Sequence, residues 1–232
     1  MQIVITGISK GLGLALTKSL LQRGHSVIGI SRSGKVFNEL ESLSLQFGNA
    51  GFIGITADIT QEVEWQRIYE IIQNSIDTIH ALINNAGILI NKPFTQMTAD
   101  DFDRMFSVNV RAFFFGIRTL IPLMRSGSHI LNIGSMGGVQ GSVKFPGLSL
   151  YSASKAAVAV MTEVLAEELR PRGIHVNCLA PGSIKTEMFR EAFLGVDEAF
   201  DPEELAEFIS DFAEYGFEFF NGKILPVSVT TP

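Results

Sequence analysis

Short apolar runs alternate with longer helical patterns along most of the chain, and this alternation limits the possible folds more than any other feature. Each run is brief and continuously apolar, as in parallel strands covered on both faces. The strand candidates are residues 2–6, 26–31, 51–58, 81–87, 129–135, 174–181 and, more weakly, 223–229. The helix candidates are residues 11–23, 61–75, 99–125, 152–170 and 203–214. Strands and helices taking turns predict an α/β fold with a doubly wound, mostly parallel seven-stranded sheet.

The chain shows no repeat, low-complexity tract or linker that would divide it. Its 232 residues are enough for one domain with a full core. Two helix starts are marked by capping patterns: Thr98 with Asp101 three residues on, and Asp201 followed by a proline. We therefore expect a single domain over residues 1–232.

Composition excludes several classes of protein. The net charge of −6 argues against a general nucleic-acid or anionic-membrane binder. The single cysteine, Cys178, cannot form an internal disulfide, which is typical of a reducing compartment. The N-terminus lacks a secretory pattern, and no run approaches the eighteen or so uninterrupted apolar residues of a membrane span. We expect a cytoplasmic protein with neither nucleic-acid nor membrane partners.

Metal and hydrolase chemistry also find no support in the sequence. The four histidines, at 25, 80, 129 and 175, show no ligand spacing, so no metal site is expected. The segment "IGSMGG" contains a serine, but a nucleophile elbow needs glycines two residues to either side. Here Gly134 is adjacent to the serine and residue 133 is isoleucine.

A glycine-rich stretch, "TGISKGLG" at 6–13, follows the first strand and opens the first helix. Gly7 can make the sharp turn, Gly11 lets a ligand approach the backbone, and Gly13 lets helix and strand pack closely. The helix start then offers free N–H groups to a pyrophosphate. The alternative is a purely structural turn, but the position in the first βαβ unit favours a dinucleotide site.

The end of the second strand bears on which dinucleotide would bind. A carboxylate there would hydrogen-bond the ribose 2′-hydroxyl of NAD, whereas arginine suits a 2′-phosphate. This chain has Ser31 and Arg32 there, and Lys10 lies in the glycine loop. Two cations would face one phosphate. The sequence therefore favours NADP(H) over NAD(H), with two ordinary solvated cations as the alternative.

Tyr151 stands four residues before Lys155 in "YSASK", at the start of a predicted helix. That spacing places both side chains on one helix face. The pair could be an ordinary surface contact, or a proton donor and the cation that tunes it. A free tyrosine titrates near pH 10, and a neighbouring cation would lower its pKa.

Six motifs together resemble the short-chain dehydrogenase/reductase family in its compact branch, most closely members like the 3-oxoacyl-carrier-protein reductases. They stand in the family's order and cover residues 1 to about 190. The motifs are "TGISKGLG", "NNAG" at 84–87, Asn109 in "FSVNV", Ser135 in "NIGSMGG", "YSASK" at 151–155 and "APGSIKT" at 180–186. The resemblance implies a Rossmann-type, NAD(P)-binding domain.

The resemblance also implies a catalytic set. Tyr151 would protonate a substrate carbonyl oxygen, and Ser135 would hold that oxygen toward it. Lys155 would lower the pKa of the tyrosine and bind the nicotinamide ribose. Asn109 would kink its helix and hold a water that links Lys155 to solvent; otherwise it is a helix-face asparagine bonded to a neighbour.

The same resemblance implies the residues that bind the cofactor. Asp58 would contact the adenine, or would otherwise be a turn residue. Ile184 would lie near the carboxamide and Thr186 near the phosphates. The full set is Gly7, Ser9, Lys10, Gly11, Leu12, Gly13, Ser31, Arg32, Asp58, Ile59, Asn85, Ala86, Gly87, Tyr151, Lys155, Pro181, Gly182, Ile184 and Thr186.

The chain departs from the family pattern in two places. Ser135 and Tyr151 are about three residues further apart than usual, through extra loop around "GSVKF", which affects the substrate pocket wall. The end, "PVSVTTP", lacks the usual final strand motif, although a homodimer or homotetramer is still expected. Residues 187–201 are a candidate substrate lid, or a completion of the core, with Met188, Phe189, Phe193 and Leu194 as apolar members.

We expect an NADPH-dependent enzyme that reduces a carbonyl substrate to an alcohol. Two alternatives stay open. One is a regulatory protein that binds NADP(H) without catalysis and acts through a partner; such proteins usually lose the tyrosine or lysine. The other is an NAD-dependent alcohol dehydrogenase, which would require the argument from Lys10 and Arg32 to fail.

Overall fold

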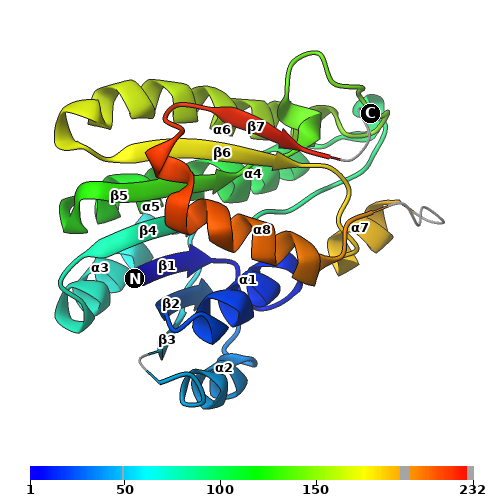
Figure 1. The fold of residues 1–232 in the computed structure, drawn as a ribbon. Helices are drawn as coiled ribbons and strands as arrows, with labels where there is room; N and C mark the ends of the chain where they lie inside the picture. The colour runs from blue at the N-terminus through cyan, green and yellow to red at the C-terminus, as the bar shows by residue number, and fades with distance from the viewer. Residues whose placement is uncertain (49, 194–198, 229–232) are drawn as a thin grey trace.

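Seven parallel strands form one sheet in the order β3-β2-β1-β4-β5-β6-β7 (Figure 1). The computed structural model describes residues 1–48, 50–193 and 199–228. The strands are β1 (Gln2–Thr6), β2 (Ser26–Ser31), β3 (Gly51–Thr56), β4 (Ile79–Asn84), β5 (Met124–Ile133), β6 (His175–Pro181) and β7 (Ile224–Val227). All seven predicted strands are therefore present, and they form the predicted parallel sheet of an α/β fold. Residue 229 of the seventh predicted strand lies outside the described residues.

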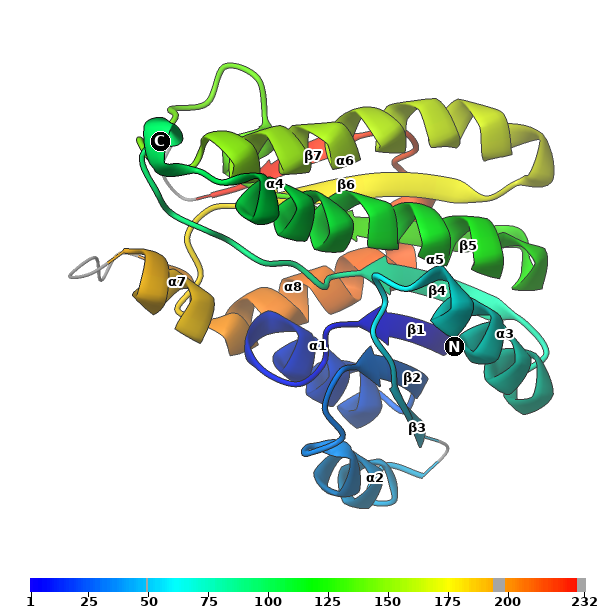
Figure 2. The ribbon, with the colours of Figure 1, turned by 180° about the vertical axis from the view of Figure 1, so that it is seen from behind.

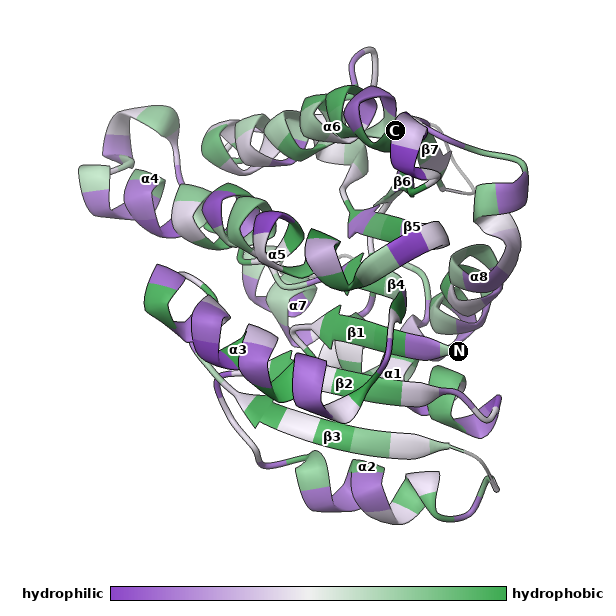
Figure 3. Cartoon of the chain, turned by 90° about the vertical axis from the view of Figure 1, so that its left-hand side faces the viewer, coloured by the Kyte–Doolittle hydropathy of each residue, from purple (hydrophilic) through white to green (hydrophobic). Residues whose placement is uncertain are grey.

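Helices cover both faces of the sheet (Figures 1 and 2). The helices are α1 (Gly11–Gln22), α2 (Phe37–Ser44), α3 (Glu62–Ser75), α4 (Ala99–Phe106), α5 (Ala112–Leu120), α6 (Ser149–Leu169), α7 (Glu187–Ala192) and α8 (Pro202–Tyr215). One core joins the sheet to α1 and α8 through residues such as Leu16 and Ile209. The other joins it to α3, α5 and α6 through Trp65, Phe115 and Ala166. Green apolar strands between two helical layers show the same arrangement in Figure 3.

The predicted helix starts are confirmed in atomic detail. Thr98 accepts a hydrogen bond from the backbone N–H of Asp101 at 3.1 Å, and the Asp101 carboxylate accepts from the N–H of Thr98 at 3.1 Å. Asp201 caps α8 by accepting from the N–H of Glu203 at 3.0 Å. Each carboxylate or hydroxyl satisfies a backbone donor that has no partner within its helix.

The predicted helix over 99–125 is a composite. It runs through α4, a π-helical turn at Ser107–Arg111, α5 and a 3₁₀ turn at Ile121–Leu123. Within the 25 residues of Ala99–Leu123, an 18-residue window has a mean hydropathy of 1.2, enough for a membrane span by length and composition alone, and 39% of that window is buried. No such segment is predicted from the sequence when uninterrupted apolar residues are required, because polar residues interrupt this one. In the fold, α5 lies against the sheet, with Phe113 and Phe115 buried.

The strand order places a crevice at the carboxyl ends of β1 and β4. The chain runs outward from β1 to β3 on one side and from β4 to β7 on the other. The loops that follow β1 and β4 therefore diverge to opposite faces, and open α/β sheets bind their ligands at this switch point.

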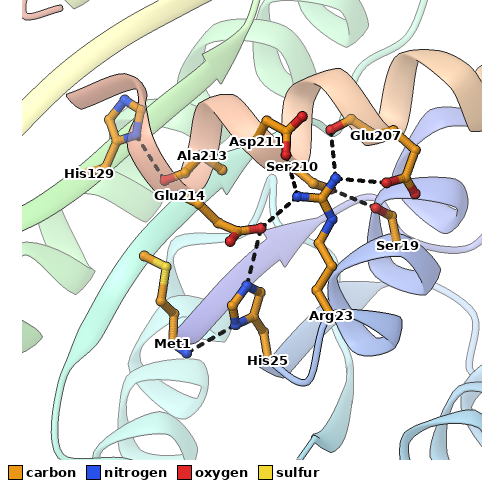
Figure 4. Close-up of polar contacts among 10 residues, drawn as sticks. All are labelled: Met1, Ser19, Arg23, His25, His129, Glu207, Ser210, Asp211, Ala213 and Glu214. Carbon is orange, nitrogen blue, oxygen red and sulfur yellow. Dashed lines mark hydrogen bonds and ion pairs between the residues drawn. The ribbon is translucent and has the colours of Figure 1, made fainter. Parts of the chain in front are cut away.

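A partly exposed polar cluster around Arg23, the C-cap of α1, connects α1 to α8 (Figure 4). The Arg23 guanidinium donates to Asp211 at 2.5 Å, to Glu207 at 2.7 Å and to Glu214 at 2.9 Å. Glu214 also lies 3.2 Å from the imidazole Nε2 of His25. Three carboxylates around one cation hold its pKa above the ordinary value, although burial opposes this.

Replacing Arg23 should therefore weaken the docking of α8. Arg23→Met leaves the clustered carboxylates without their cation, and we expect the free energy of unfolding to fall by about 1–3 kcal/mol. Arg170→Met is a matched control, because within the described residues Arg170 pairs only with Glu167 and both side chains are well exposed. Its effect should stay below about 0.5 kcal/mol. Denaturant unfolding of both variants would contradict this account if Arg23→Met were as stable as the control.

Candidate active site

A pocket of about 640 Å³ lies at the carboxyl edge of the sheet. Every residue of the predicted cofactor set lines it, and so does Ser135. Of the predicted catalytic set only Asn109 is not part of the wall. The wall residues that were not predicted are Ile30, Ser33, Ala57, Thr60, Ile88, Asp103, Arg104, Ser107, Val108, Ile133 and Gly134, whereas Glu187 and Met188 belong to the segment predicted as a candidate lid.

The glycine loop is packed so tightly that side chains are excluded from two of its positions. Gly7 has φ +79° and a Cβ there would lie 2.8 Å from the Cα of Ala86. A Cβ on Gly13 would lie 2.2 Å from the carbonyl oxygen of Gly7. The loop therefore leads closely into α1, whose first turn carries no acidic residue and whose N-cap, Lys10, makes no side-chain cap. The free N–H groups of this turn face the pocket as an anion site.

Alanine at position 13 should test how far this packing can relax. Its Cβ would meet the Gly7 carbonyl and, at 2.5 Å, the Asn85 Nδ2. We expect Gly13→Ala to lower the free energy of unfolding by about 1–3 kcal/mol, because overpacking displaces backbone. Gly51→Ala is the control, since its nearest contact, Ser26 Oγ, lies at 3.5 Å. If thermal unfolding showed the two variants to be equally stable, α1 could shift to accommodate the added Cβ without cost, and the prediction would be wrong.

The segment "NNAG" is bonded to the glycine loop. Asn85 Nδ2 donates to the carbonyl oxygens of Thr6 at 3.0 Å and of Gly7 at 3.2 Å. In return, Thr6 Oγ1 accepts from the backbone N–H groups of Asn85 and Ala86, each at 3.2 Å. Asn85 thus positions the loop, and Thr6, which the sequence analysis did not single out, completes the contact.

The predicted cation pair near β2 is only partly as expected. Arg32 is exposed and, in the part of the chain that the structure describes, its side chain forms no hydrogen bond or ion pair. Lys10 instead pairs with Glu187, the first residue of α7. Asp58 holds a turn by accepting from the N–H and hydroxyl of Thr60 at 3.0 and 2.8 Å. The turn function that the sequence left open for Asp58 is therefore present, on the wall of the pocket.

Tyr151 and Ser135 meet across the pocket. Ser135 follows β5, and its Oγ accepts from the N–H of Gly137 at 3.2 Å. Ser135 lies close enough to Tyr151 to lower the tyrosine pKa. Burial has the larger, opposite effect, so the pKa of Tyr151 lies above its ordinary value of 10. The phenol therefore keeps its proton at neutral pH and can donate a hydrogen bond.

Lys155 lies beside the Tyr151 ring. Its Nζ lies 6.0 Å from the Tyr151 ring centroid and donates to the carbonyl oxygen of Ile133 at 2.9 Å. Burial lowers the pKa of Lys155 to about 8. The net shift of the Tyr151 pKa is upward because burial outweighs the contribution of Ser135, and the expected lowering by Lys155 stays a prediction.

Asn109 sits at the centre of the π-helical turn, fully buried. Its Oδ1 accepts from the N–H of Ile88 at 2.8 Å, and its Nδ2 donates to the Ile88 carbonyl oxygen and to Ser154 Oγ, both at 2.9 Å. The local distortion of the helix is therefore present as predicted. A Cβ on Gly87 would lie 3.4 Å from both Asn109 Oδ1 and Lys155 Nζ, so these atoms flank one point behind the pocket wall.

The extra loop and the candidate lid meet beside the site. Phe145, in the loop before α6, packs edge-on against Phe193 with ring centroids 6.2 Å apart. Phe193 also lies 5.2 Å from Phe189, which is buried. Met188 lines the pocket, whereas Leu194 and the rest of residues 194–198 lie outside the described residues. The candidate lid thus begins with the short helix α7, in which Phe189 is buried and Met188 lines the pocket.

Comparison with known proteins identifies relatives along most of the chain. A sequence model of the family described as short chain dehydrogenase matches residues 1–196. The cyclopentanol dehydrogenase of Comamonas sp. (strain NCIMB 9872) is 34% identical over 192 residues, which cover 82% of this chain and 75% of that protein.

Two solved structures share the fold and more than a quarter of the residues. A short chain dehydrogenase from Burkholderia cenocepacia J2315 in complex with NADP is 27% identical, with a TM-score of 0.88 over 97% of this chain and 95% of that one. The 3-ketoacyl-(acyl-carrier-protein) reductase from Brucella melitensis, complexed with NADH, is 26% identical, with a TM-score of 0.85 over 97% and 96%. The chain is therefore an oxidoreductase of the short chain dehydrogenase family.

Proposed function

We propose that this protein reduces a carbonyl compound to an alcohol at the expense of NADPH, with Tyr151 as the general acid. The observation that carries the proposal is the convergence of Tyr151, Ser135 and Lys155 on the pocket that also contains the glycine loop. Carbonyl reduction requires a dinucleotide-binding site and a protonated phenol in the same pocket.

The residues present are suited to a dinucleotide. The tight contacts at Gly7 and Gly13 bring bare backbone to the pocket. The uncapped first turn of α1 offers N–H donors and the positive end of a helix dipole to a pyrophosphate. When bound, the cofactor supplies the hydride.

The chemistry of the chain's own residues concerns the substrate oxygen. Ser135 Oγ and Tyr151 can both hydrogen-bond that oxygen, which orients the carbonyl. Tyr151 then donates its proton as negative charge develops on the oxygen. Lys155, charged below a pKa of about 8, stabilises the phenolate that remains. The raised pKa of Tyr151 favours the direction of reduction, because the acid stays protonated at neutral pH.

We propose NADPH over NADH because Arg32 directly follows β2, at the point where a carboxylate would select the ribose hydroxyls. The Arg32 side chain lines the pocket and is not engaged elsewhere among residues 1–48, 50–193 and 199–228. Arg32→Ala should weaken NADPH binding by about tenfold or more and NADH binding by less than about twofold. Equal weakening of both cofactors would contradict this preference.

Steady-state oxidation of NADPH against a panel of ketones, quinones and β-keto thioesters tests the activity itself. Turnover on at least one carbonyl class is the expected result. Tight NADPH binding with no turnover on any class would instead support the regulatory alternative. Faster reduction of NAD⁺ by a secondary alcohol than any NADPH-dependent reduction would support the alcohol dehydrogenase alternative.

The proposed assembly and location follow the family. The apolar side chains of Phe102, Phe114, Val160 and Val164, on α4, α5 and α6, are exposed in the isolated chain. Helices α4–α6 cover one face of the molecule (Figure 2), and a second copy could pack its own helices there. We therefore propose a homodimer or larger homo-oligomer in the cytoplasm.

A further inference from the structure

An ion pair connects two distant segments at the mouth of the pocket. The ammonium of Lys10, in the glycine loop, contacts the carboxylate of Glu187, at the start of α7. Both residues line the pocket. Lys10 is predicted from the sequence to be a cation available to a ligand, whereas in the fold it has a carboxylate partner.

Glu187 is held at this position by the backbone around it. Thr186 caps α7 by accepting from the N–H of Phe189 at 3.3 Å. The methyl group of Thr186 lies 3.1 Å from the point where a Cβ on Gly11 would stand, so the start of α7 contacts the glycine loop. At the other end of the helix, Asn91 Nδ2 donates to the carbonyl oxygen of Ala192 at 2.8 Å. The two segments are therefore held close together by these contacts, and the ion pair depends on that arrangement more than on the length of the Lys10 and Glu187 side chains.

The charges at this point bear directly on phosphate binding. Lys10 holds the pKa of Glu187 below its usual range, and Arg190 acts in the same direction. Glu187 is thus a full negative charge at neutral pH. It neutralises one of the two cations proposed for the 2′-phosphate, and it repels any phosphate that approaches Lys10. Because the pair is exposed to solvent, a phosphate can displace it at modest cost.

We propose that Glu187 is a cofactor-selectivity residue that competes with the 2′-phosphate of NADPH for Lys10 and so limits the preference for NADPH over NADH. This inference rests on the proposed dinucleotide site. It predicts that the chain binds NADPH less tightly than it would if Lys10 and Arg32 faced the 2′-phosphate without Glu187. It also predicts that the carboxylate of Glu187, and no other charge on α7, sets the limit.

Equilibrium titration of the purified protein with NADPH and with NADH, followed by cofactor fluorescence at low ionic strength, provides the test. In Glu187→Gln the dissociation constant for NADPH should fall by about three- to tenfold, and that for NADH by less than about twofold. Glu191→Gln is the matched control, because it removes the same charge from the exposed side of α7. It should change neither constant by more than about twofold.

Lys10→Met identifies the partner through which Glu187 acts. In the Lys10→Met background, adding Glu187→Gln should no longer favour NADPH over NADH, because the cation for which carboxylate and phosphate compete is gone. An unchanged NADPH affinity in Glu187→Gln, an equal gain for both cofactors, or an equal gain in Glu191→Gln would overturn the inference. Wild-type protein that binds neither cofactor would refute the proposed dinucleotide site itself, which is a distinguishable result.

Discussion

Tyr151→Phe should reduce the rate of carbonyl reduction by at least about 100-fold, because positioned general acids contribute roughly 10²–10⁴-fold to turnover. The substitution removes one oxygen from a ring whose position in α6 is otherwise unchanged. NADPH affinity should therefore remain within about twofold of wild type, since the phenylalanine ring preserves the shape of the pocket wall. Steady-state kinetics on the best substrate, combined with a cofactor titration, would measure both effects.

Tyr215→Phe is the control for this substitution. Tyr215 is exposed at the end of α8 and is not part of the pocket wall, so its variant should retain wild-type rates. A Tyr151→Phe enzyme with more than about a third of the wild-type rate would show that another group or water supplies the proton.

Lys155→Met should stabilise the fold while it impairs catalysis. The shift of the Lys155 pKa from 10.5 to about 8 corresponds to roughly 3 kcal/mol of cost for holding the charged form in the folded protein. Methionine removes that cost but leaves the Ile133 carbonyl oxygen without its 2.9 Å donor, which costs about 1 kcal/mol or more. We therefore expect the free energy of unfolding at pH 7 to rise by about 1–2 kcal/mol and turnover to fall by at least about tenfold.

The pH dependence of this effect has a definite sign. Between pH 8 and 10.5 the unfolded chain still binds a proton that folded Lys155 has released. Stability from this group therefore rises with pH across that window. Lys155→Met lacks the rise, so its advantage over wild type should shrink from pH 8 to 10.5. Denaturant unfolding at several pH values would contradict the account if the variant were less stable than wild type at pH 7.

The strands could be predicted because each is a short, continuously apolar run, and their alternation with helices leaves few topologies. The missed helices lack such a signal. In α2 only Leu40 and Ser44 are buried, and α7 has six residues with Phe189 as its one buried side chain. Helices so short gain their stability from tertiary contacts, which sequence periodicity does not report.

The pocket wall was predictable where fixed spacing carries the information. The glycines at 7, 11 and 13, and the Tyr151–Lys155 pair, are set by a turn and by helical repeat. The Lys10–Glu187 pair joins residues 177 positions apart, so no local pattern indicates it. The direction in which the Tyr151 pKa shifts could not be predicted either, because it depends on how deeply the folded chain buries the phenol.

Transfer of deuterium from NADPH labelled at C4 of the nicotinamide into the product alcohol tests the central claim most directly. Mass spectrometry of products from the carbonyl panel should detect one deuterium on the former carbonyl carbon with wild-type protein, and only background levels with Tyr151→Phe. Labelled alcohol formed equally well by Tyr151→Phe would contradict the assignment of the proton donor. The absence of label in every product, from protein that binds NADPH tightly, would contradict carbonyl reduction as the function.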